Sequence, residues 1–238
     1  MTDPLFRDDA YLSICEATVE AVNDRGGIVL DRTIFYATGG GQPGDTGSLE
    51  RADGSRIAIG ATVYGADKSE IVHVPANQDT LPEPGEKVVC HIDWDRRHRL
   101  MRMHTAMHLL SAVLPYPVTG GSVGEDVSRL DFDIPDSGLD KEEITAKVNE
   151  LIARDEPVTT EWITDAELEA NPGLVKTMSV KPPMGSGKVR LVRIGAETDL
   201  QPCGGTHVKA TGEIGPIEVA KIEKKGRQNR RVRIKLTD

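Results

Sequence analysis

Several features are scarce or absent in this sequence, and each absence excludes a class of protein. The 238 residues include three cysteines, an odd number at wide spacing, which argues against a disulfide framework. Aromatic residues make up 4% of the chain, so the interior has to consist of aliphatic side chains. No apolar run approaches the roughly 20 residues of a membrane helix, and the first residues lack the pattern of a signal peptide. We therefore expect a cytoplasmic protein with no membrane partner.

The charge is acidic on average but basic in two places. A formal net charge of −9 argues against indiscriminate binding of nucleic acid. Arginines cluster within Arg96–Arg102, and a longer basic stretch covers Lys221–Lys235. This pattern fits a partner that is met on one face, although a solvated basic surface explains it equally well. No segment indicates an obligate protein partner.

The first 95 residues have the pattern of β structure. Short runs of alternating apolar and polar residues are separated by turn signals such as Asp53-Gly54 and Pro84-Gly85. Strands are predicted at residues 11–22, 27–30, 56–64, 70–74 and 87–93. Short strands with glycine-rich turns and no helix predict a small β-barrel-like domain over residues 1–95.

The pattern changes after residue 95 to a mixture of helices and strands. Arg96–Leu114 contains no glycine or proline and has helical apolar spacing. Further helices are predicted at Asp140–Asp155 and Asp165–Asn171, each capped by its first aspartate. Strands are predicted at residues 128–134, 157–163, 189–194, 213–224 and 230–236. We therefore assign the chain to the α+β class, with residues 96–238 forming a second domain of helices packed on an antiparallel sheet.

Two short motifs each contain a pair of potential metal ligands separated by three residues. His104 and His108 lie in the first predicted helix, where positions i and i+4 share a face. Cys203 and His207 enclose Gly204-Gly205, and we expect these glycines to let the loop curl through backbone angles closed to other residues. Each pair by itself is also explained by ordinary core or surface residues.

Together the two motifs supply three imidazoles and one thiolate. Zinc prefers this number and type of donors, whereas magnesium and calcium prefer oxygen. We therefore predict one zinc ion per chain, held by His104, His108, Cys203 and His207. Four protein ligands are typical of a structural site, but a histidine-rich set with one pair on a helix is more usual at functional sites. The spacing therefore leaves the role of the metal open.

The motifs resemble those of the editing domain of alanyl-tRNA synthetase and of its free-standing relatives, the AlaX-type alanyl-tRNA editing proteins. The resemblance rests on His104–Leu110, on Cys203–Val208 followed by Thr211–Gly215, and on the segments Gly39–Gly47 and Gly121–Phe132. It covers roughly residues 30–235. The length, with an N-terminal domain and no C-terminal extension, resembles the medium-sized class of these proteins.

The resemblance implies a hydrolase that removes serine, and in some members glycine, wrongly esterified to the 3′ end of alanine tRNA. It also implies the same four zinc ligands, tRNA as the partner, and a barrel-like N-terminal domain before the editing domain. No adenylate-forming motif is seen, so the chain is expected to edit tRNA without charging it. The catalytic base stays open, because no Ser-His-Asp set or pair of carboxylates stands out.

A substrate pocket is implied near these motifs. Thr105 and Ser122 agree with the family pattern, whereas Met107 stands where the synthetase domain often has threonine and Thr119 where we align its glutamine. The glycine-rich segment by itself indicates an ordinary turn. Within the family this segment bears on recognition of serine, and the residues expected to contribute are Gly40, Gly41, Gln42 and Asp45.

The same resemblance gives the two basic clusters a partner. Residues 224–231 are expected to form a hairpin turn between two strands, and Arg96–Arg102 leads into the histidine helix. We predict phosphate contacts near the acceptor end of tRNA, which give affinity and salt dependence without reading the sequence. The predicted contacts are Arg97, Arg102, Lys225, Arg227 and Arg230.

Three functions are compatible with these observations. The leading one is a zinc-dependent hydrolase of mischarged alanine tRNA. The second is a non-catalytic tRNA-binding module with a structural zinc, and the third is an esterase acting on another aminoacyl ester. Release of amino acid from seryl-tRNA separates the first from the second.

Overall fold

The computed structural model describes residues 1–66, 69–77, 80–135, 138–177 and 187–237. The chain forms two compact units, Met1–Arg99 and Leu100–Asp238. The predicted division at residues 95 and 96 falls close to this boundary, and the functions assigned to the two parts stay predictions. Among the described residues, no helix combines the length and apolar character needed to cross a bilayer.

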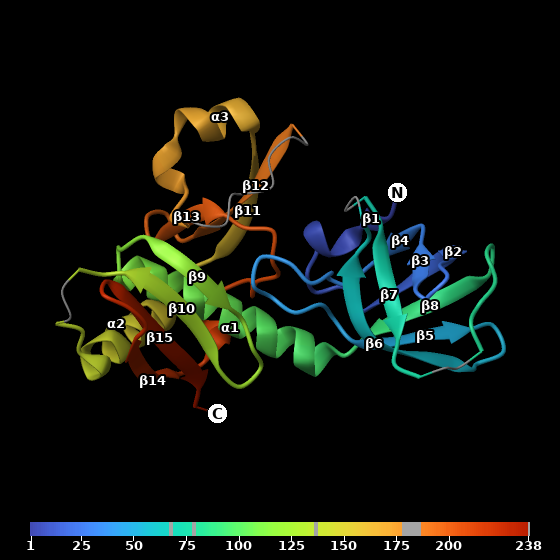
Figure 1. Ribbon diagram of the computed structural model, residues 1–238, viewed down its shortest axis with the longest axis horizontal. Helices are drawn as coiled ribbons and strands as arrows, with labels where there is room; N and C mark the ends of the chain where they lie inside the picture. Colours follow the sequence, from blue (N-terminus) through green and yellow to red (C-terminus); the bar gives the residue numbers. More distant parts are fainter. Residues whose placement is uncertain (67–68, 78–79, 136–137, 178–186, 238) are drawn as a thin grey trace. The chain divides into compact units, whose positions relative to one another are not determined.

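The first unit is built on a closed barrel of antiparallel strands in the order β2-β3-β7-β6-β5-β8 (Figure 1). Its strands are β2 Ile14–Val22, β3 Ile28–Leu30, β5 Gly47–Arg51, β6 Arg56–Tyr64, β7 Ile71–Pro75 and β8 Lys87–Ile92. The unit also holds β1 Asp3–Pro4, the 3-10 helix η1 Leu5–Arg7 and β4 Arg32–Thr33. The prediction of a small β-barrel-like fold is confirmed.

Aliphatic side chains fill the barrel, as the scarcity of aromatic residues requires. Fully buried examples are Ile28, Leu30, Ile34, Leu49 and Ile57, which lie in one cluster with Cys90. Cys90 on β8 is the register partner of Cys15 on β2. All three cysteines lie within the described residues and are free thiols.

His73 on β7 lies in the interior of the first unit, and its burial predicts a pH dependence of stability. Its side chain is fully buried, with one ring nitrogen 2.8 Å from the Thr33 hydroxyl and the other 3.0 Å from the Ile28 carbonyl. Burial lowers the pKa of His73 from 6.5 to about 4. Between these values the unfolded chain binds a proton that the folded chain excludes. The contribution of the neutral His73 to the free energy of unfolding is therefore fully present above pH 6.5. It is lost as the pH falls toward 4.

We expect His73 to reduce the free energy of unfolding by about 3 kcal/mol when the pH falls through this window. Urea unfolding of the wild type and of His73→Gln, at about pH 7 and about pH 4.5, measures the effect. The variant lacks the imidazole, so its stability should fall less than that of the wild type between the two conditions. An equal fall in both proteins would show that His73 does not carry the pH dependence.

The second unit combines helices with two antiparallel sheets, of strand order β14-β15-β10-β9 and β11-β12-β13 (Figure 1). Its helices are α1 Trp94–Val113, which begins in the first unit, α2 Lys141–Ala153 and α3 Asp165–Ala170, with 3-10 turns η2 Pro172–Leu174 and η3 Thr211–Ile214. Its strands are β9 Val118–Ser122, β10 Ser128–Asp133, β11 Val158–Thr164, β12 Lys188–Ile194, β13 Asp199–Pro202, β14 Ile217–Lys224 and β15 Asn229–Leu236. The predicted α+β class is confirmed.

Helix capping agrees with the sequence prediction in one case and differs in another. Asp140 caps α2 as predicted, since its carboxylate accepts the Glu143 amide at 2.8 Å. The prediction that Asp165 caps α3 is wrong. Thr164 is the cap, because its hydroxyl accepts the Glu167 amide at 3.1 Å and the Glu167 carboxylate accepts the Thr164 amide at 2.7 Å. This reciprocal capping box satisfies two amides that a cap at Asp165 leaves open.

Some elements differ from the prediction because their sequences carry weak alternation. β5 contains a single fully buried aliphatic residue, Leu49, and β9 contains two glycines. β13 is short and ends at Pro202. The strand expected at residues 213–224 begins only at Ile217, because Thr211–Ile214 forms η3.

Candidate metal centre

Two segments of the second unit that are far apart in the sequence meet in a cluster of four potential metal ligands. His104 and His108 come from α1, and Cys203 and His207 come from the loop after β13. Their ligand atoms all lie within 4.8 Å of one another, and the three histidines are buried. The Cys203 Sγ lies 3.3 Å from His207 Nε2 and 3.6 Å from His104 Nε2. The structure thus brings together the four residues that the spacing selected.

The Cys203 loop is held by Arg190 on β12. One terminal nitrogen of its guanidinium donates to the carbonyls of Cys203, at 2.9 Å, and Gly205, at 3.0 Å. Neither Gly204 nor Gly205 has a positive φ, so the expectation that they supply backbone angles closed to other residues is wrong. A Cβ at Gly204 would meet no heavy atom within 4 Å. The loop therefore depends on a tertiary hydrogen bond more than on glycine flexibility.

Thr105 sets the orientation of His207. The Thr105 hydroxyl donates to the Met101 carbonyl at 2.9 Å, so it acts as an acceptor toward His207 Nδ1 at 3.1 Å. Because that ring nitrogen then carries the proton, Nε2 keeps its lone pair and faces Cys203. Thr105, a predicted pocket residue, is therefore hydrogen-bonded to the ring nitrogen of the predicted ligand His207 that does not face Cys203.

Asp199 on β13 plays the same part for His108. Its Oδ2 accepts a hydrogen bond from His108 Nδ1 at 2.9 Å, and its Oδ1 pairs with Lys176 Nζ at 2.5 Å. Gln201 Nε2 also donates to Asp199 Oδ2, at 2.7 Å. A carboxylate behind a histidine fixes the ring and makes it a better metal ligand.

The electrostatics of the cluster suit a cation. Burial raises the pKa of the Cys203 thiol, but His104 and His207 outweigh burial and hold that pKa well below its ordinary value. Burial lowers the pKa of His207 to about 3, with His104 acting in the same direction, so this imidazole is neutral. Burial also lowers the pKa of His108, but Asp199 and Cys203 raise it to about 9. A thiolate and a carboxylate thus stabilise positive charge here, and the donor set fits zinc.

We expect Asp199→Asn to weaken zinc binding by about 10–100-fold, because an amide is a poorer partner for the His108 ring than a carboxylate. Competition with a chromophoric chelator measures the change in affinity. Glu197→Gln makes the same chemical change at an exposed residue two positions earlier and should bind zinc as the wild type does. Equal affinity in both variants would remove Asp199 from the support of the metal site.

Asp199 and Gln201 were not selected by the sequence prediction. The available signal is their spacing, since Asp199 and Gln201 lie at alternate positions of β13 and share a face, and Cys203 follows two positions later. Alternation alone does not show that this face of β13 contacts the helix that carries His104 and His108. The hydrogen bond between Asp199 and His108 in the structure identifies the supporting residues.

The other residues expected in the pocket of the second unit occupy different places. Met107 is buried on α1, and its Cε would lie 3.4 Å from a Cβ at Gly121 on β9. The Thr119 hydroxyl donates to the Asp131 carbonyl at 3.1 Å and accepts from Asn229 at 2.9 Å. Ser122 is half-buried at the end of β9. Their contact with a substrate stays a prediction.

The glycine-rich segment lies in the first unit and forms a tight turn. The Gly39 amide donates to the Gln42 carbonyl at 3.1 Å, and the Gln42 amide donates back at 2.9 Å. Gly40 and Gly41 have φ values of 56° and 84°, the left-handed region that glycine adopts without strain. Both glycines are exposed, whereas Gln42 is buried. The turn is as expected, and a role in serine recognition stays a prediction.

Asp45 and Arg97 need correction as predicted contact residues, because they bind each other in the interior of the first unit. Both side chains are buried, with Arg97 Nε 3.0 and 2.9 Å from the two Asp45 oxygens. Arg97 also donates to the carbonyls of Ala10, at 2.9 Å, and Ile34, at 2.6 Å. Neither side chain is available to a substrate pocket or to tRNA phosphates. Their role is structural.

The remaining predicted tRNA contacts differ in exposure: Arg102 and Arg230 are partly or fully buried, whereas Lys225 and Arg227 are exposed. Arg102 is half-buried and donates to the Ile214 carbonyl at 2.8 Å. Arg230 is buried, and its guanidinium donates to the Asn229 carbonyl at 3.1 Å, so its assignment as a phosphate contact is also corrected. Lys225 and Arg227 are exposed between β14 and β15, which form the expected hairpin.

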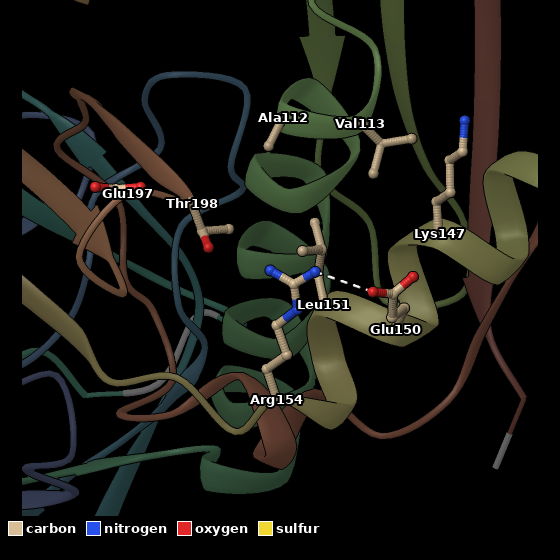
Figure 2. Close-up of a pocket in the computed structure, with 8 residues that line it drawn as sticks. All are labelled: Ala112, Val113, Lys147, Glu150, Leu151, Arg154, Glu197 and Thr198. Carbon is tan, nitrogen blue, oxygen red and sulfur yellow. Dashed lines mark hydrogen bonds and ion pairs between the residues drawn. The ribbon is translucent and has the colours of Figure 1, made fainter.

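Figure 2 shows a separate hollow of the second unit, about 420 Å³ in volume. It is lined by side chains of α1, α2 and the turn before β13, which are Ala112, Val113, Lys147, Glu150, Leu151, Arg154, Glu197 and Thr198. Arg154 pairs with Glu150 at 3.0 Å, and Lys147 pairs with Glu143 at 2.6 Å. The lining residues include no ligand of the cluster, so the hollow is not part of the candidate metal centre.

Two family models match parts of this chain. The threonyl and alanyl tRNA synthetase second additional domain matches residues 189–233, which include Cys203 and His207. The model of class II (A) tRNA synthetases matches residues 12–96, most of the first unit.

Individual proteins are similar over a longer span. The alanyl-tRNA editing protein AlaX-M of Methanosarcina barkeri is 38% identical over 245 residues, and the AlaX-M protein of Methanosarcina acetivorans is 39% identical over 249 residues. Both alignments cover 100% of each chain. The alanine–tRNA ligase of Pyrobaculum calidifontis is 36% identical over 94% of this chain, which corresponds to 25% of the ligase.

Proposed function

Because this chain belongs to the family of alanyl-tRNA editing proteins, we propose that it deacylates mischarged alanine tRNA. The observation that carries the proposal is the cluster of His104, His108, Cys203 and His207, in a chain whose full-length relatives bear the editing name. The proposed substrates are seryl-tRNA and glycyl-tRNA for alanine. A pocket built for alanine cannot strongly reject such small analogues, so a second, hydrolytic site is useful.

We propose one zinc ion as the cofactor, held by the four ligands of the cluster. A bound zinc supplies polarisation of a carbonyl or activation of water. The chain itself supplies rigidity: Asp199 orients His108, Thr105 orients His207, and Arg190 holds the Cys203 loop. Four protein donors would fill the positions that zinc usually offers, which favours a metal that would organise the pocket.

Hydrolysis of the ester requires little catalysis from residues other than the metal ligands. An aminoacyl ester is already labile, so a pocket that orients the ester carbonyl and a water molecule accelerates its hydrolysis. We propose that Thr105, Met107, Thr119 and Ser122 of the second unit border this pocket. The glycine-rich turn of the first unit is proposed to bear on the selection of serine through the exposed Gly40 and Gly41, with the buried Gln42 supporting the turn.

The test of the function is release of amino acid. Purified protein is incubated with seryl-, glycyl- and alanyl-tRNA for alanine, and free amino acid is followed against spontaneous hydrolysis. We expect seryl-tRNA to be deacylated faster than alanyl-tRNA. Absence of release from every mischarged tRNA, with tRNA binding retained, would leave a non-catalytic binding module in place of the enzyme.

We propose that Lys225 and Arg227, at the exposed hairpin of β14 and β15, contact tRNA phosphates. Arg227→Glu is expected to weaken tRNA binding and to reduce the dependence of log K on log salt by about one unit. Filter binding over a range of salt concentrations measures both quantities. Arg154→Glu, a charge reversal of another exposed arginine in the second unit, is the matched control. The same salt dependence in Arg227→Glu and the wild type would exclude the hairpin as a phosphate contact.

A further inference from the structure

An exposed tryptophan lies in the sheet that carries the Cys203 ligand. Trp162 on β11 is 46% exposed, and it is one of two tryptophans in the chain. It pairs in register with Arg190 on β12. The Cys203 amide in turn donates to the Arg190 carbonyl at 3.1 Å. The strands β11, β12 and β13 are neighbours in this order (Figure 1). Trp162, Arg190 and Cys203 thus form one row across β11, β12 and the first residue after β13.

Residues in one row of an antiparallel sheet point to the same face. Neighbouring strands lie about 4.8 Å apart, so the backbones of Trp162 and Cys203 are separated by roughly 10 Å. The opposite face of the sheet is taken by an apolar cluster that includes Val189, Leu191 and Leu168 of α3. Trp162 therefore shares its face with the metal ligand and not with that cluster.

The indole is accessible on this face. Thr160 and Thr164 precede and follow Trp162 on the same side of β11, and both are exposed. Arg190, in the middle of the row, is 8% exposed and is bonded to the Cys203 and Gly205 carbonyls. The row thus has the exposed indole at one end, the hydrogen-bonded Arg190 side chain in the middle and Cys203 at the other end.

We propose that Trp162 is the stacking platform for the terminal adenine base of tRNA while the aminoacyl ester lies at the metal cluster. This inference rests on the proposed function. Proteins bind unpaired bases by stacking them on aromatic side chains. The base and the ester of the terminal nucleotide are joined through one ribose, so the base has to stack on a side chain close to the cluster, and Trp162 lies only two strand spacings from Cys203. Trp162 is therefore a positioning residue, which holds the nucleoside while the ester reacts.

The first test measures stacking without any reaction. Trp94→Phe leaves Trp162 as the sole tryptophan, and Trp162→Phe leaves Trp94, which stacks on His98 in the first unit. Each variant is titrated with unacylated alanine tRNA and with adenosine monophosphate, and tryptophan emission is followed. We expect saturable quenching in Trp94→Phe and none in Trp162→Phe. Binding of tRNA to Trp94→Phe without a change in emission would overturn the proposal.

The second test compares side chains at the same position in deacylation of seryl-tRNA. We expect Trp162→Ala to raise KM about tenfold with kcat nearly unchanged, the effect of losing one base–aromatic stack. Trp162→Phe should stay close to the wild type, whereas Trp162→Leu should resemble Trp162→Ala. Thr159→Ala, on the opposite face of β11, is the matched control. Equal KM values for the leucine and phenylalanine variants would overturn stacking.

The two tests separate this inference from the function on which it rests. Quenching by tRNA in a protein that deacylates no substrate would reject the proposed function and retain the platform. Deacylation without quenching would retain the function and reject the platform. Zinc content and thermal unfolding of Trp162→Ala are expected to match the wild type, because the side chain lies at the surface. Loss of either would assign Trp162 a structural role instead.

Discussion

Replacing Cys203 with alanine is expected to abolish stoichiometric zinc binding and deacylation together. The substitution removes the thiolate from a set of four donors whose atoms lie within 4.8 Å of one another. Loss of a residue that hydrogen-bonds to a metal ligand already lowers metal affinity about 10–100-fold, and loss of the ligand itself should lower the affinity further. Metal analysis of the purified protein and the rate of release of serine from seryl-tRNA measure the two effects.

Two variants serve as controls, one for loss of a thiol elsewhere in the chain and one for a methyl group added to the Cys203 loop. Cys15→Ala removes a thiol of the barrel in the first unit and should keep both zinc and activity. Gly204→Ala adds a methyl group to the same loop, where a Cβ meets no heavy atom within 4 Å, and should keep zinc. Survival of zinc and deacylation in Cys203→Ala would show that the ligand set is wrong. Retention of zinc with loss of deacylation would place Cys203 in the reaction and not in metal binding.

Arg97→Ala is expected to lower the free energy of unfolding by about 3–5 kcal/mol. The wild-type guanidinium binds the buried carboxylate of Asp45 through Nε, at 3.0 and 2.9 Å, and donates to two carbonyls. Its removal leaves the Asp45 carboxylate in the interior beside the Tyr36 amide, which donates to it at 2.6 Å. One amide does not replace a cation, so the burial of the charge becomes costly. Urea unfolding at neutral pH measures the loss.

Arg56→Ala provides the comparison for this ion pair. Arg56 pairs with Glu50 at 2.6 Å in the same unit, but its side chain is 58% exposed. A surface pair contributes about 1 kcal/mol or less, so this variant should remain close to the wild type. Equal small decreases of the free energy of unfolding in Arg56→Ala and Arg97→Ala would show that the buried Arg97–Asp45 pair does not stabilise the first unit more than a surface pair does.

Prediction of secondary structure succeeded where the periodicity was strong. The helix predicted over 96–114 is α1, and its apolar positions Leu100, Met103 and Leu110 are buried. β5, β9 and β13 were missed because short strands with few aliphatic residues carry little alternation. The cap of α3 was misplaced by one residue, since both Thr164 and Asp165 are good capping residues and only the geometry distinguishes them.

The sequence by itself determined the pairing of the candidate ligands and the class of fold. Helical spacing puts His104 and His108 on one face, and the short Cys203–His207 loop keeps the other pair close, because both relations are local. Barrel character likewise follows from alternation within short segments. The chemical type of these donors then predicts zinc in preference to magnesium or calcium.

Only the tertiary structure decided which residues support those ligands and which charges are available to a partner. Asp199 stands behind His108, and Arg190 holds the Cys203 loop, through contacts between elements far apart in the chain. The sequence shows Arg97 and Arg227 as similar basic residues, yet one is buried against Asp45 and the other is exposed. Burial and strand register depend on long-range packing, which a local pattern does not encode.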